Sequence, residues 1–227
     1  HLNSVAFSSW GGASLAALEF YGIKGKTVLC PSNTFMATPL AAIKTGNRVE
    51  FVDCNKEDLC ISYEDLKEKI ENYVKSNYPD MNFIFVNNEK YASTNCIYSM
   101  WLCREHLNED TIFLTGDLIF GSKVMKDMVY SKFSNIMYVN PEAQINEKNF
   151  KVKIGNNDFI KEIGVNVFDE NAKIAYPLYK LSKSSMKIWM KEIDNYIQQD
   201  KTNLYGEDAF NNIINLIKNG ADPNFVD

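Results

Sequence analysis

Short runs of apolar, β-branched and aromatic residues alternate along the chain with longer stretches in which apolar positions recur at helical spacing. The runs predict strands at residues 27–30, 48–53, 82–87, 111–115, 135–139 and 175–182. The stretches predict helices at residues 12–22, 33–46, 63–76, 94–107, 182–199 and 206–220. Because strands that alternate with helices usually form βαβ units, we predict an α/β fold, a three-layer αβα arrangement with a mainly parallel sheet.

The segment from residue 140 to residue 172 breaks this alternation. Its apolar and polar residues alternate singly, and asparagines enrich its turns, as in "IGNNDF". Gly155, Asn156 and Asn157 all tolerate the positive φ angles of tight turns. We therefore expect a small β-hairpin region at one end of the sheet instead of a further strand–helix unit.

A change of character near Pro79 predicts two domains. In "NYPDMN" the proline and its polar neighbours separate a helical pattern from the apolar run that follows. We expect one domain at residues 1–79 and a second at residues 80–227. Within the first, Ser62 predicts a helix N-cap and Gly46 predicts a helix end in the left-handed region.

The composition is that of a globular protein without a surface for polyanions. Apolar residues make up 45% of the 227 positions, and the net charge is −5 with a pI near 5.2. Because 24 basic residues are scattered among 29 acidic ones, neither nucleic acid nor an anionic membrane is an expected partner. No apolar run reaches the roughly 20 residues of a membrane span, and the amino-terminal residues lack a signal-peptide pattern. We expect a cytoplasmic protein.

The cysteine and histidine residues do not predict a zinc site or a Ser-His-Asp triad. The cysteines are odd in number and lack CxxC spacing, which favours reduced thiols over disulfides or zinc ligands; they are Cys30, Cys54, Cys60, Cys96 and Cys103. Apart from His1 the sequence has only His106, so neither a Ser-His-Asp triad nor a histidine zinc site is expected. For His106 two interpretations stay open: a helix-end histidine, which the dipole favours, and a residue that acts alone.

A single charge interrupts the apolar run "TIFLTGDLIFG" at residues 111–121. Asp117 follows a predicted strand, and Gly116 before it lets the backbone approach another group closely. Ligands of parallel α/β sheets gather beyond the carboxyl ends of the strands. From these residues alone, Asp117 is either a turn residue or a ligand for a bound group.

Four motifs in the first third of the chain follow one another in a specific order. They are the small-residue turn in "SSWGGASLAALEF", the strand entry "GIKGKTV", the motif "PSNTF" and the strand in "GNRVEFVD". With this order, residues 5 to about 72 resemble the start of the large domain of PLP-dependent sugar aminotransferases of the DegT/StrS family. The resemblance implies that Gly11, Gly12 and Ser14 hold the cofactor phosphate and that Phe35 lies against the pyridine ring.

A Gly-Gly turn at a helix start suits a phosphate for a general reason. Unpaired N–H groups and the positive end of the helix dipole converge there, although an ordinary tight turn remains the alternative. PLP-dependent aminotransfer also needs a lysine for the Schiff base and an acid for the pyridinium nitrogen. The family motifs that carry these two residues are not found in the sequence.

Three blocks in the later part of the chain carry a second resemblance. They are "YASTNCIYSMWLCREHL", "TIFLTGDLIF" and the stretch from "YPLYKLSKSS" to "NLYGEDAF". Residues from about 82 to 227 resemble the later part of nucleotidyltransferases of the choline-phosphate cytidylyltransferase-like group, which includes sugar-phosphate nucleotidyltransferases. The resemblance implies that Asp117 is the catalytic ligand of Mg²⁺ and that a cytidylyl group passes from CTP to a phosphorylated small alcohol or sugar, with release of pyrophosphate. Magnesium commonly uses one or two carboxylates together with phosphates and water.

Several polar and aromatic side chains in these blocks are candidates for contact with nucleotide or acceptor. They are Asn95, Tyr98, Ser99, Tyr205, Glu207 and Asp208. Asn95 and Ser99 lie opposite an apolar stripe that suits the core. Carboxylates and aromatic rings, including Trp101, would attract a cationic acceptor such as phosphocholine. For Glu207 and Asp208 the alternative is a first-turn pair that complements the helix dipole.

The glycine-rich, arginine-containing loop that grips the triphosphate in such nucleotidyltransferases is not found before residue 82. Whether the chain is an enzyme therefore stays open, with nucleotidyl transfer favoured. The alternatives are a relative of the PLP-dependent sugar aminotransferases and a catalytically inactive hybrid that acts as a structural or interaction protein. The expected partners are a nucleotide, with CTP favoured, and a phosphorylated small molecule, and self-association into a homo-oligomer is a further option.

Overall fold

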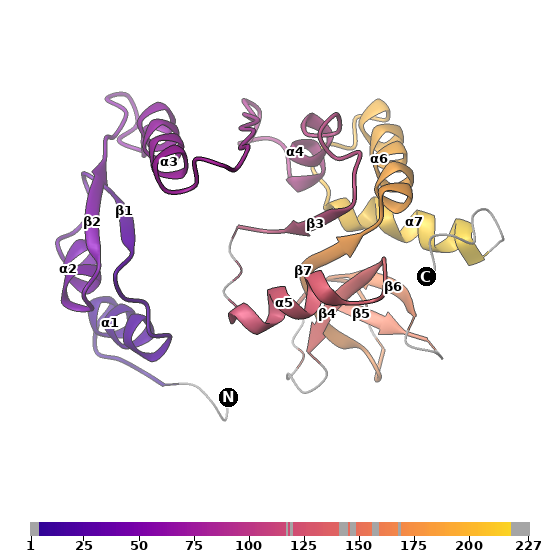
Figure 1. Ribbon diagram of the computed structural model, residues 1–227, viewed down its shortest axis with the longest axis horizontal. Helices are drawn as coiled ribbons and strands as arrows, with labels where there is room; N and C mark the ends of the chain where they lie inside the picture. Colours follow the sequence, from indigo (N-terminus) through magenta and orange to yellow (C-terminus); the bar gives the residue numbers. More distant parts are fainter. Residues whose placement is uncertain are drawn as a thin grey trace. The chain divides into compact units, whose positions relative to one another are not determined.

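The chain folds into two units, residues 1–84 and residues 85–227 (Figure 1). The structure is a computed structural model, and it describes residues 5–116, 118, 120–140, 145, 149–155, 159–167 and 169–218. Each unit has its own strands and helices and is described by itself. The division into domains 1–79 and 80–227 stays a prediction.

The first unit alternates helices and strands. Its elements are α1 (Trp10–Phe20), β1 (Thr27–Pro31), α2 (Ala37–Lys44), β2 (Arg48–Val52) and α3 (Tyr63–Asn77). The strands predicted at 27–30 and 48–53 correspond to β1 and β2, which pair in parallel from Thr27 opposite Arg48 to Pro31 opposite Val52. The pairing is parallel because the chain returns to the start of β2 through the crossover helix α2.

Local signals in the sequence set two helix ends in this unit. The Ser62 hydroxyl accepts a hydrogen bond from the amide of Asp65 at 3.4 Å and so caps the start of α3. Gly46 has a φ angle of 81° shortly after α2, and its amide donates to the carbonyl of Ile43 at 2.9 Å. The predicted N-cap and the predicted helix end are both confirmed.

The first unit buries few large side chains. Its buried apolar residues include Cys30, Ala41, Ala42 and Val52, and α3 buries none of its residues. The large apolar side chains that are exposed in this unit include Trp10, Phe20, Phe35, Met36, Ile43 and Phe51. Since hydrophobic stabilisation scales with the apolar area that is buried, this small core contributes little, and the unit keeps an unusually apolar surface.

The second unit contains a five-stranded sheet and four helices among its described residues. Its elements are α4 (Cys96–Leu102), β3 (Thr111–Leu114), α5 (Ser122–Tyr130), β4 (Ile136–Asn140), β5 (Lys151–Ile154), β6 (Ile160–Gly164), β7 (Lys173–Leu181), α6 (Lys183–Gln198) and α7 (Gly206–Lys218). Strand β7 is the centre of the sheet, because β3, β4 and β5 all pair with it. Strand β6 extends the sheet beyond β5.

The pairings described in this sheet are all antiparallel, which corrects the expectation of a mainly parallel sheet. Within the described residues only β1 and β2 are parallel. The reason is the β5–β6 hairpin, which reverses the chain, so that β7 runs opposite to the strands beside it. The hairpin itself confirms the prediction for residues 140–172; the amide of Gly155 donates to the carbonyl of Phe159 at 2.7 Å, whereas Asn156 and Asn157 lie outside the described residues. The three-layer arrangement stays a prediction.

The core of the second unit lies between the sheet and helices α4, α6 and α7. Trp189 of α6 is fully buried, and its ring meets those of Phe113, Tyr179 and Phe210 edge-on, with centres 5.9, 5.8 and 5.2 Å away. Such edge-on contacts add to the stabilisation from burial. Further buried side chains of this core are Ile97, Val152, Met186, Ile193 and Ile213.

Three elements differ from their predictions. Residues 82–87 form neither strand nor helix, and Phe83–Val86 remain partly exposed, since a high strand propensity needs a partner strand to be realised. Helix α4 ends at Leu102 instead of residue 107, because turns follow it. Helix α5 was not predicted, and among its residues only Met128 is buried, so the core pattern at this place is weak.

Candidate functional site

Thr115, the residue directly after β3, makes two backbone hydrogen bonds. The amide of Thr115 continues the sheet by donating to the carbonyl of Pro177 at 3.3 Å, and the carbonyl of Thr115 accepts from the amide of Leu118 at 3.4 Å. Gly116, between them, is exposed, and a Cβ atom at this glycine would meet nothing within 4 Å. Asp117 itself lies outside the described residues. The segment that carries the predicted metal ligand therefore begins at an open strand end.

The start of α4 meets the segment that leads into α7. The side chain of Asn95 caps α4 by accepting from the amide of Cys96 at 2.8 Å, while the amide of Asn95 donates to the carbonyl of Thr202 at 3.0 Å. The amide of Ile97 donates to the carbonyl of Leu204 at 3.3 Å. Residues about 100 positions apart in the sequence are thus joined at this junction.

A side-chain hydrogen-bond cluster lies beside the first turn of α4. The side-chain amide Nδ2 of Asn88 donates to the hydroxyl of Thr94 at 3.1 Å and to the hydroxyl of Ser99 at 3.0 Å. The backbone carbonyl of Lys90 accepts from the Thr94 hydroxyl at 2.8 Å. Ser99 is exposed, so its hydroxyl remains close to solvent as well as to Asn88. Asn88 was not singled out from the sequence, because nothing in its neighbourhood marks it as a partner of Ser99.

Two aromatic rings on α4 each contact a positively charged side chain of the protein. Tyr98 stacks on Trp101 with ring centres 5.6 Å apart. The ammonium of Lys90 lies 5.7 Å from the centre of the Tyr98 ring, and the guanidinium of Arg104 lies 4.1 Å from that of Trp101. The indole N–H of Trp101 donates to Asp194 at 2.9 Å. Both rings therefore already make cation–π contacts within the chain and do not offer a free aromatic surface to a cationic ligand.

Glu207 lies in the core and not at the surface. Its carboxylate accepts a hydrogen bond of 2.6 Å from the Tyr179 hydroxyl of β7, and only 5% of the residue is exposed. Burial raises the pKa of Glu207, and the bond from Tyr179 opposes that shift only in part. Burial, followed by the charge of Glu207, also raises the pKa of Tyr179 well above its usual value.

Cys96 completes the same buried polar group. Its sulfur accepts from the amide of Gly206 at 3.4 Å, and the carbonyl of Gly206 accepts from the indole N–H of Trp189 at 2.9 Å. Burial raises the pKa of Cys96 to about 11, and Glu207 adds to the shift. The raised pKa disfavours the thiolate form, which is the nucleophile and metal ligand, and Cys96 forms no disulfide.

Asp208 and Tyr205 form the start of α7. The carboxylate of Asp208 accepts from the amide of Tyr205 at 2.9 Å, in the manner of the acidic half of a capping box. The ring of Tyr205 is partly exposed and meets Phe150 edge-on, with centres 5.8 Å apart. The structure thus brings Asn95, Tyr205 and Asp208 to one junction, with Glu207 beneath it. Their role in substrate binding stays a prediction.

In the first unit the proposed phosphate turn lies at the start of α1. Ser9 caps this helix by accepting from the amide of Gly12 at 3.2 Å, so this N–H group already has a partner. A Cβ atom on Gly11 would lie 3.4 Å from that of Ala37 in α2, which lets the two helices approach closely. Ser14 follows in the first turn of α1, and Phe35, two residues before α2, is 80% exposed.

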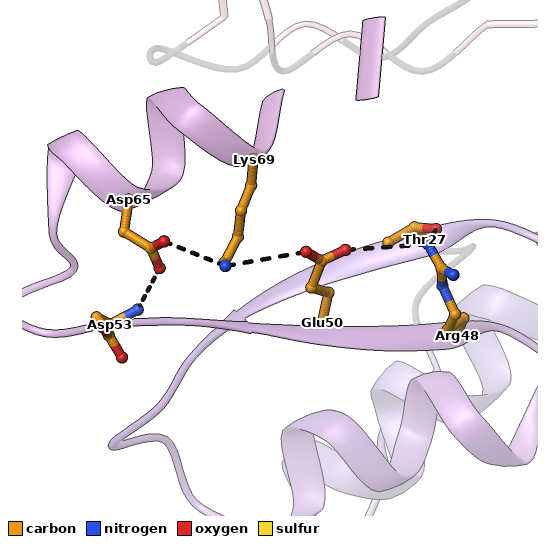
Figure 2. Close-up of polar contacts among 6 residues, drawn as sticks. All are labelled: Thr27, Arg48, Glu50, Asp53, Asp65 and Lys69. Atoms are coloured by element: carbon orange, nitrogen blue, oxygen red, sulfur yellow. Dashed lines mark hydrogen bonds and ion pairs between the residues drawn. The ribbon is translucent and has the colours of Figure 1, made fainter. Parts of the chain in front are cut away.

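A polar cleft of about 300 Å³ lies between β2 and α3 in the first unit. Figure 2 shows its ion pairs, in which the ammonium of Lys69 lies 3.1 Å from Asp65 and 3.9 Å from Glu50. Asp65 also accepts from the amide of Asp53 at 2.8 Å. This amide, followed by Lys69, lowers the pKa of Asp65, and the contact with Asp65 raises the pKa of Lys69. Since the pairs are open to solvent, each stabilises the fold only weakly.

No group of three or more His, Cys, Asp or Glu side chains within the described ranges is arranged to hold a metal ion. The role of Asp117 as a magnesium ligand stays a prediction. No helix of the described part of the chain has the length and the apolar run of a membrane span.

Comparison with known proteins gives one family match and similar solved structures. Residues 1–77 match the DegT/DnrJ/EryC1/StrS aminotransferase family, which confirms the first resemblance. Among solved structures, the inositol-1-phosphate CTP transferase from T. maritima is similar to this chain, with 19% identity and a TM-score of 0.43; the match covers 80% of this chain and 63% of that protein. The chain therefore spans less than two thirds of that transferase.

A second similar structure is the CTP:phosphocholine cytidylyltransferase from Streptococcus pneumoniae. Its identity is 16% and its TM-score 0.44, over 93% of this chain and 74% of that protein. No curated protein matches the chain by sequence. The aminotransferase-family match is limited to residues 1–77 and so applies to the first unit, not to the whole chain.

Proposed function

We propose that the second unit carries out Mg²⁺-dependent nucleotidyl transfer, with Asp117 as the metal ligand. The observation that supports this most is the open strand end after β3. Thr115 follows β3 directly, Gly116 is exposed, and a Cβ atom at Gly116 would meet nothing within 4 Å. A carboxylate in this segment can meet a bound phosphate, because a β-strand that ends at the surface presents the residues after it to solvent.

The reaction forms one P–O bond and breaks another. A phosphate oxygen of the acceptor attacks the α-phosphorus of the nucleotide, and the bond from that phosphorus to the bridging oxygen of pyrophosphate breaks. Bound Mg²⁺ supplies charge neutralisation for the phosphates. The chain contributes position and fixed charge, as in phosphoryl transfer generally. CTP is the proposed nucleotide.

The proposed acceptor is a phosphorylated small alcohol or sugar. Lys90 and Arg104 lie against the rings of Tyr98 and Trp101, so this part of α4 presents positive charge. Positive charge attracts the phosphate of an acceptor and repels a quaternary ammonium group. For an acceptor that binds beside α4, this charge would favour an uncharged sugar or polyol body over phosphocholine.

The test is release of pyrophosphate from CTP and Mg²⁺ in the presence of a panel of acceptors. Sugar 1-phosphates, inositol 1-phosphate and phosphocholine cover the two acceptor chemistries, and ATP, GTP and UTP replace CTP in parallel reactions. We expect release with CTP and a sugar or polyol phosphate. Absence of pyrophosphate with every pair would overturn the proposal.

We propose PLP binding by the first unit as a second candidate, because residues 1–77 match an aminotransferase family. Gly11 and Ser14 would contact the cofactor phosphate and Phe35 the pyridine ring. The fit is partial, since the amide of Gly12 already donates to Ser9. When bound, PLP supplies an electron sink for reactions at the amine-bearing carbon.

Titration with PLP tests this second candidate directly. A new absorbance band that borohydride fixes to a lysine would support it, and loss of the band in Phe35→Ala would tie it to the first unit. A protein that gives neither this band nor pyrophosphate would favour the third alternative, a structural or interaction protein.

A further inference from the structure

One buried hydroxyl at the end of β3 has no hydrogen-bond partner. Thr115 Oγ1 is covered from solvent, and no described residue lies within hydrogen-bond distance of it. Buried polar atoms in folded proteins almost always have partners, because leaving one without a partner destabilises the fold. An exception next to a proposed site therefore suggests a partner that arrives with a ligand.

The backbone on both sides of this hydroxyl is fixed. The amide of Thr115 donates to Pro177, and its carbonyl accepts from Leu118. These two bonds hold the backbone of Thr115, and rotation about χ1 moves the hydroxyl among three staggered positions, so that it can turn from its covered position toward a ligand. A donor on such a fixed backbone is preorganised for a ligand, since little conformational freedom remains to be lost.

The surface directly beside the hydroxyl is open. Leu114 and Gly116, the two neighbours of Thr115, are both exposed, and space around Gly116 extends at least 4 Å from a Cβ position. A group that binds over Gly116 lies beside the residue that follows Thr115 in the sequence. The hydroxyl thus lies just below the surface on which the proposed reaction would take place.

A second buried atom without a partner lies elsewhere in the same unit and serves as a comparison. Asn135 Nδ2 has no partner among the described residues, while its Oδ1 accepts from the amide of Ser182 at 3.0 Å. Ser182 follows the end of β7, whereas Thr115 bonds to Pro177, five residues earlier. At about 3.3 Å per residue, the two positions are about 16 Å apart along the strand.

We propose that the Thr115 hydroxyl donates a hydrogen bond to a phosphate oxygen of the bound nucleotide. Hydrogen bonds to charged acceptors are the strongest that a hydroxyl makes, and a phosphate is the anionic group that the reaction brings to this strand end. The inference rests on the proposed nucleotidyl transfer. It adds a phosphate-binding residue that neither sequence resemblance assigned.

The test compares Thr115→Val with Thr115→Ser in two measurements, thermal unfolding of the free protein and calorimetric titration with CTP and Mg²⁺. Valine removes the hydroxyl and keeps the shape, so the free protein should melt at a higher temperature. Affinity for CTP should fall about 10- to 100-fold, the loss of one hydrogen bond to a charged group. Serine keeps the hydroxyl and should bind CTP within about threefold of the unchanged protein.

Two controls separate the possible outcomes. Asn135→Ala should change the melting temperature and leave the affinity for CTP unchanged, because this residue lies away from the strand end. Thr115→Ala provides a second hydroxyl deletion should valine alter the packing. Unchanged CTP affinity in both hydroxyl deletions would overturn the inference and leave the proposed function standing. An unchanged protein that binds no nucleotide would instead contradict the proposed function, and the inference with it.

Discussion

The side chain of Asn211 takes the place of a strand at the edge of β6 by pairing with Ile163. The amide of Ile163 donates to Oδ1 of Asn211 at 2.9 Å, and Nδ2 of Asn211 donates to the carbonyl of Ile163 at 2.6 Å. Strand β6 ends the order of strands in this sheet, so these two backbone groups have no strand beside them. Helix α7 is thereby held against the sheet edge by a pair of reciprocal hydrogen bonds.

Replacing Asn211 with leucine should therefore destabilise the second unit. Both backbone groups of Ile163 lose their partner in a place that α7 covers, which costs about 2–4 kcal/mol of the free energy of unfolding. Urea denaturation measures the change. Asn212→Leu is the matched control, because this exposed neighbour bonds only to Glu192 and Tyr196 at the surface; it should cost less than about 1 kcal/mol. Equal losses for both variants would contradict this role of Asn211.

The buried carboxyl of Glu207 should make stability depend on pH. Burial raises its pKa in the folded state above the ordinary value of 4.5, so the folded protein holds this proton more tightly than the unfolded chain. Its contribution to stability is therefore fully present below about pH 4.5 and is lost as the pH rises through the raised value. Urea denaturation from pH 4.5 upward should show this decline.

Glu207→Gln is the variant that tests the assignment. Glutamine keeps the acceptor for the Tyr179 hydroxyl and does not titrate, so the decline with pH should become smaller. Tyr179→Phe should act in the opposite direction, because it removes the hydroxyl that donates to the buried carboxylate, at a cost of about 1–3 kcal/mol near neutral pH. An unchanged pH profile in Glu207→Gln would show that another group causes the dependence.

Gly206 has no room for a side chain. A Cβ atom there would lie 2.5 Å from Sδ of Met100 and 3.3 Å from the ring of Trp189. Gly206→Ala should therefore lower the free energy of unfolding by about 1–2 kcal/mol, the usual range for overpacking a core. Gly116→Ala is the control, because a Cβ atom there meets nothing within 4 Å. The prediction fails should the two variants melt at the same temperature.

Leu59 holds a strained backbone in the first unit. Its φ angle is 59°, which costs a side-chain-bearing residue about 1–2 kcal/mol, and its side chain is 64% exposed. Leu59→Gly should therefore stabilise the loop by about 1 kcal/mol and slow amide hydrogen exchange in residues 54–61. Leu59→Ala keeps the strain and should give no such gain, which separates relief of strain from removal of an exposed apolar group.

The elements that the sequence predicted correctly are those with local signals. Ser62 and Gly46 fix helix ends through bonds to neighbouring residues, and β1 and β2 follow from apolar runs on either side of one helix. The direction of β7 could not be read in this way, because it depends on the hairpin that precedes it. Residues 82–87 carry the residue types of a strand, yet pairing with another strand is not a property of the run itself.

The sequence offers candidate site residues but not their surroundings. Asn95 was chosen because it lies opposite an apolar stripe, and Tyr205 and Asp208 as an aromatic ring and a carboxylate for the acceptor; the structure brings them to one junction, and their role in binding stays a prediction. The hydrogen bond from Tyr179 to Glu207 joins residues 28 positions apart, and no periodicity in the sequence predicts it. Thr115 gave no signal either, because a missing partner becomes visible only when the neighbours of a buried atom are known.

Steady-state release of pyrophosphate is the most direct test of the proposed role of Asp117 in nucleotidyl transfer. The assay uses CTP, Mg²⁺ and a sugar phosphate with the unchanged protein, Asp117→Ala and Asp127→Ala. Asp127 is an exposed carboxylate of α5 that pairs with Lys123, so its loss controls for a change of charge alone. We expect release that stops on chelation of Mg²⁺, falls at least about 100-fold in Asp117→Ala and persists in Asp127→Ala. Release that is equal in all three proteins, or absent from the unchanged one, would contradict this role of Asp117.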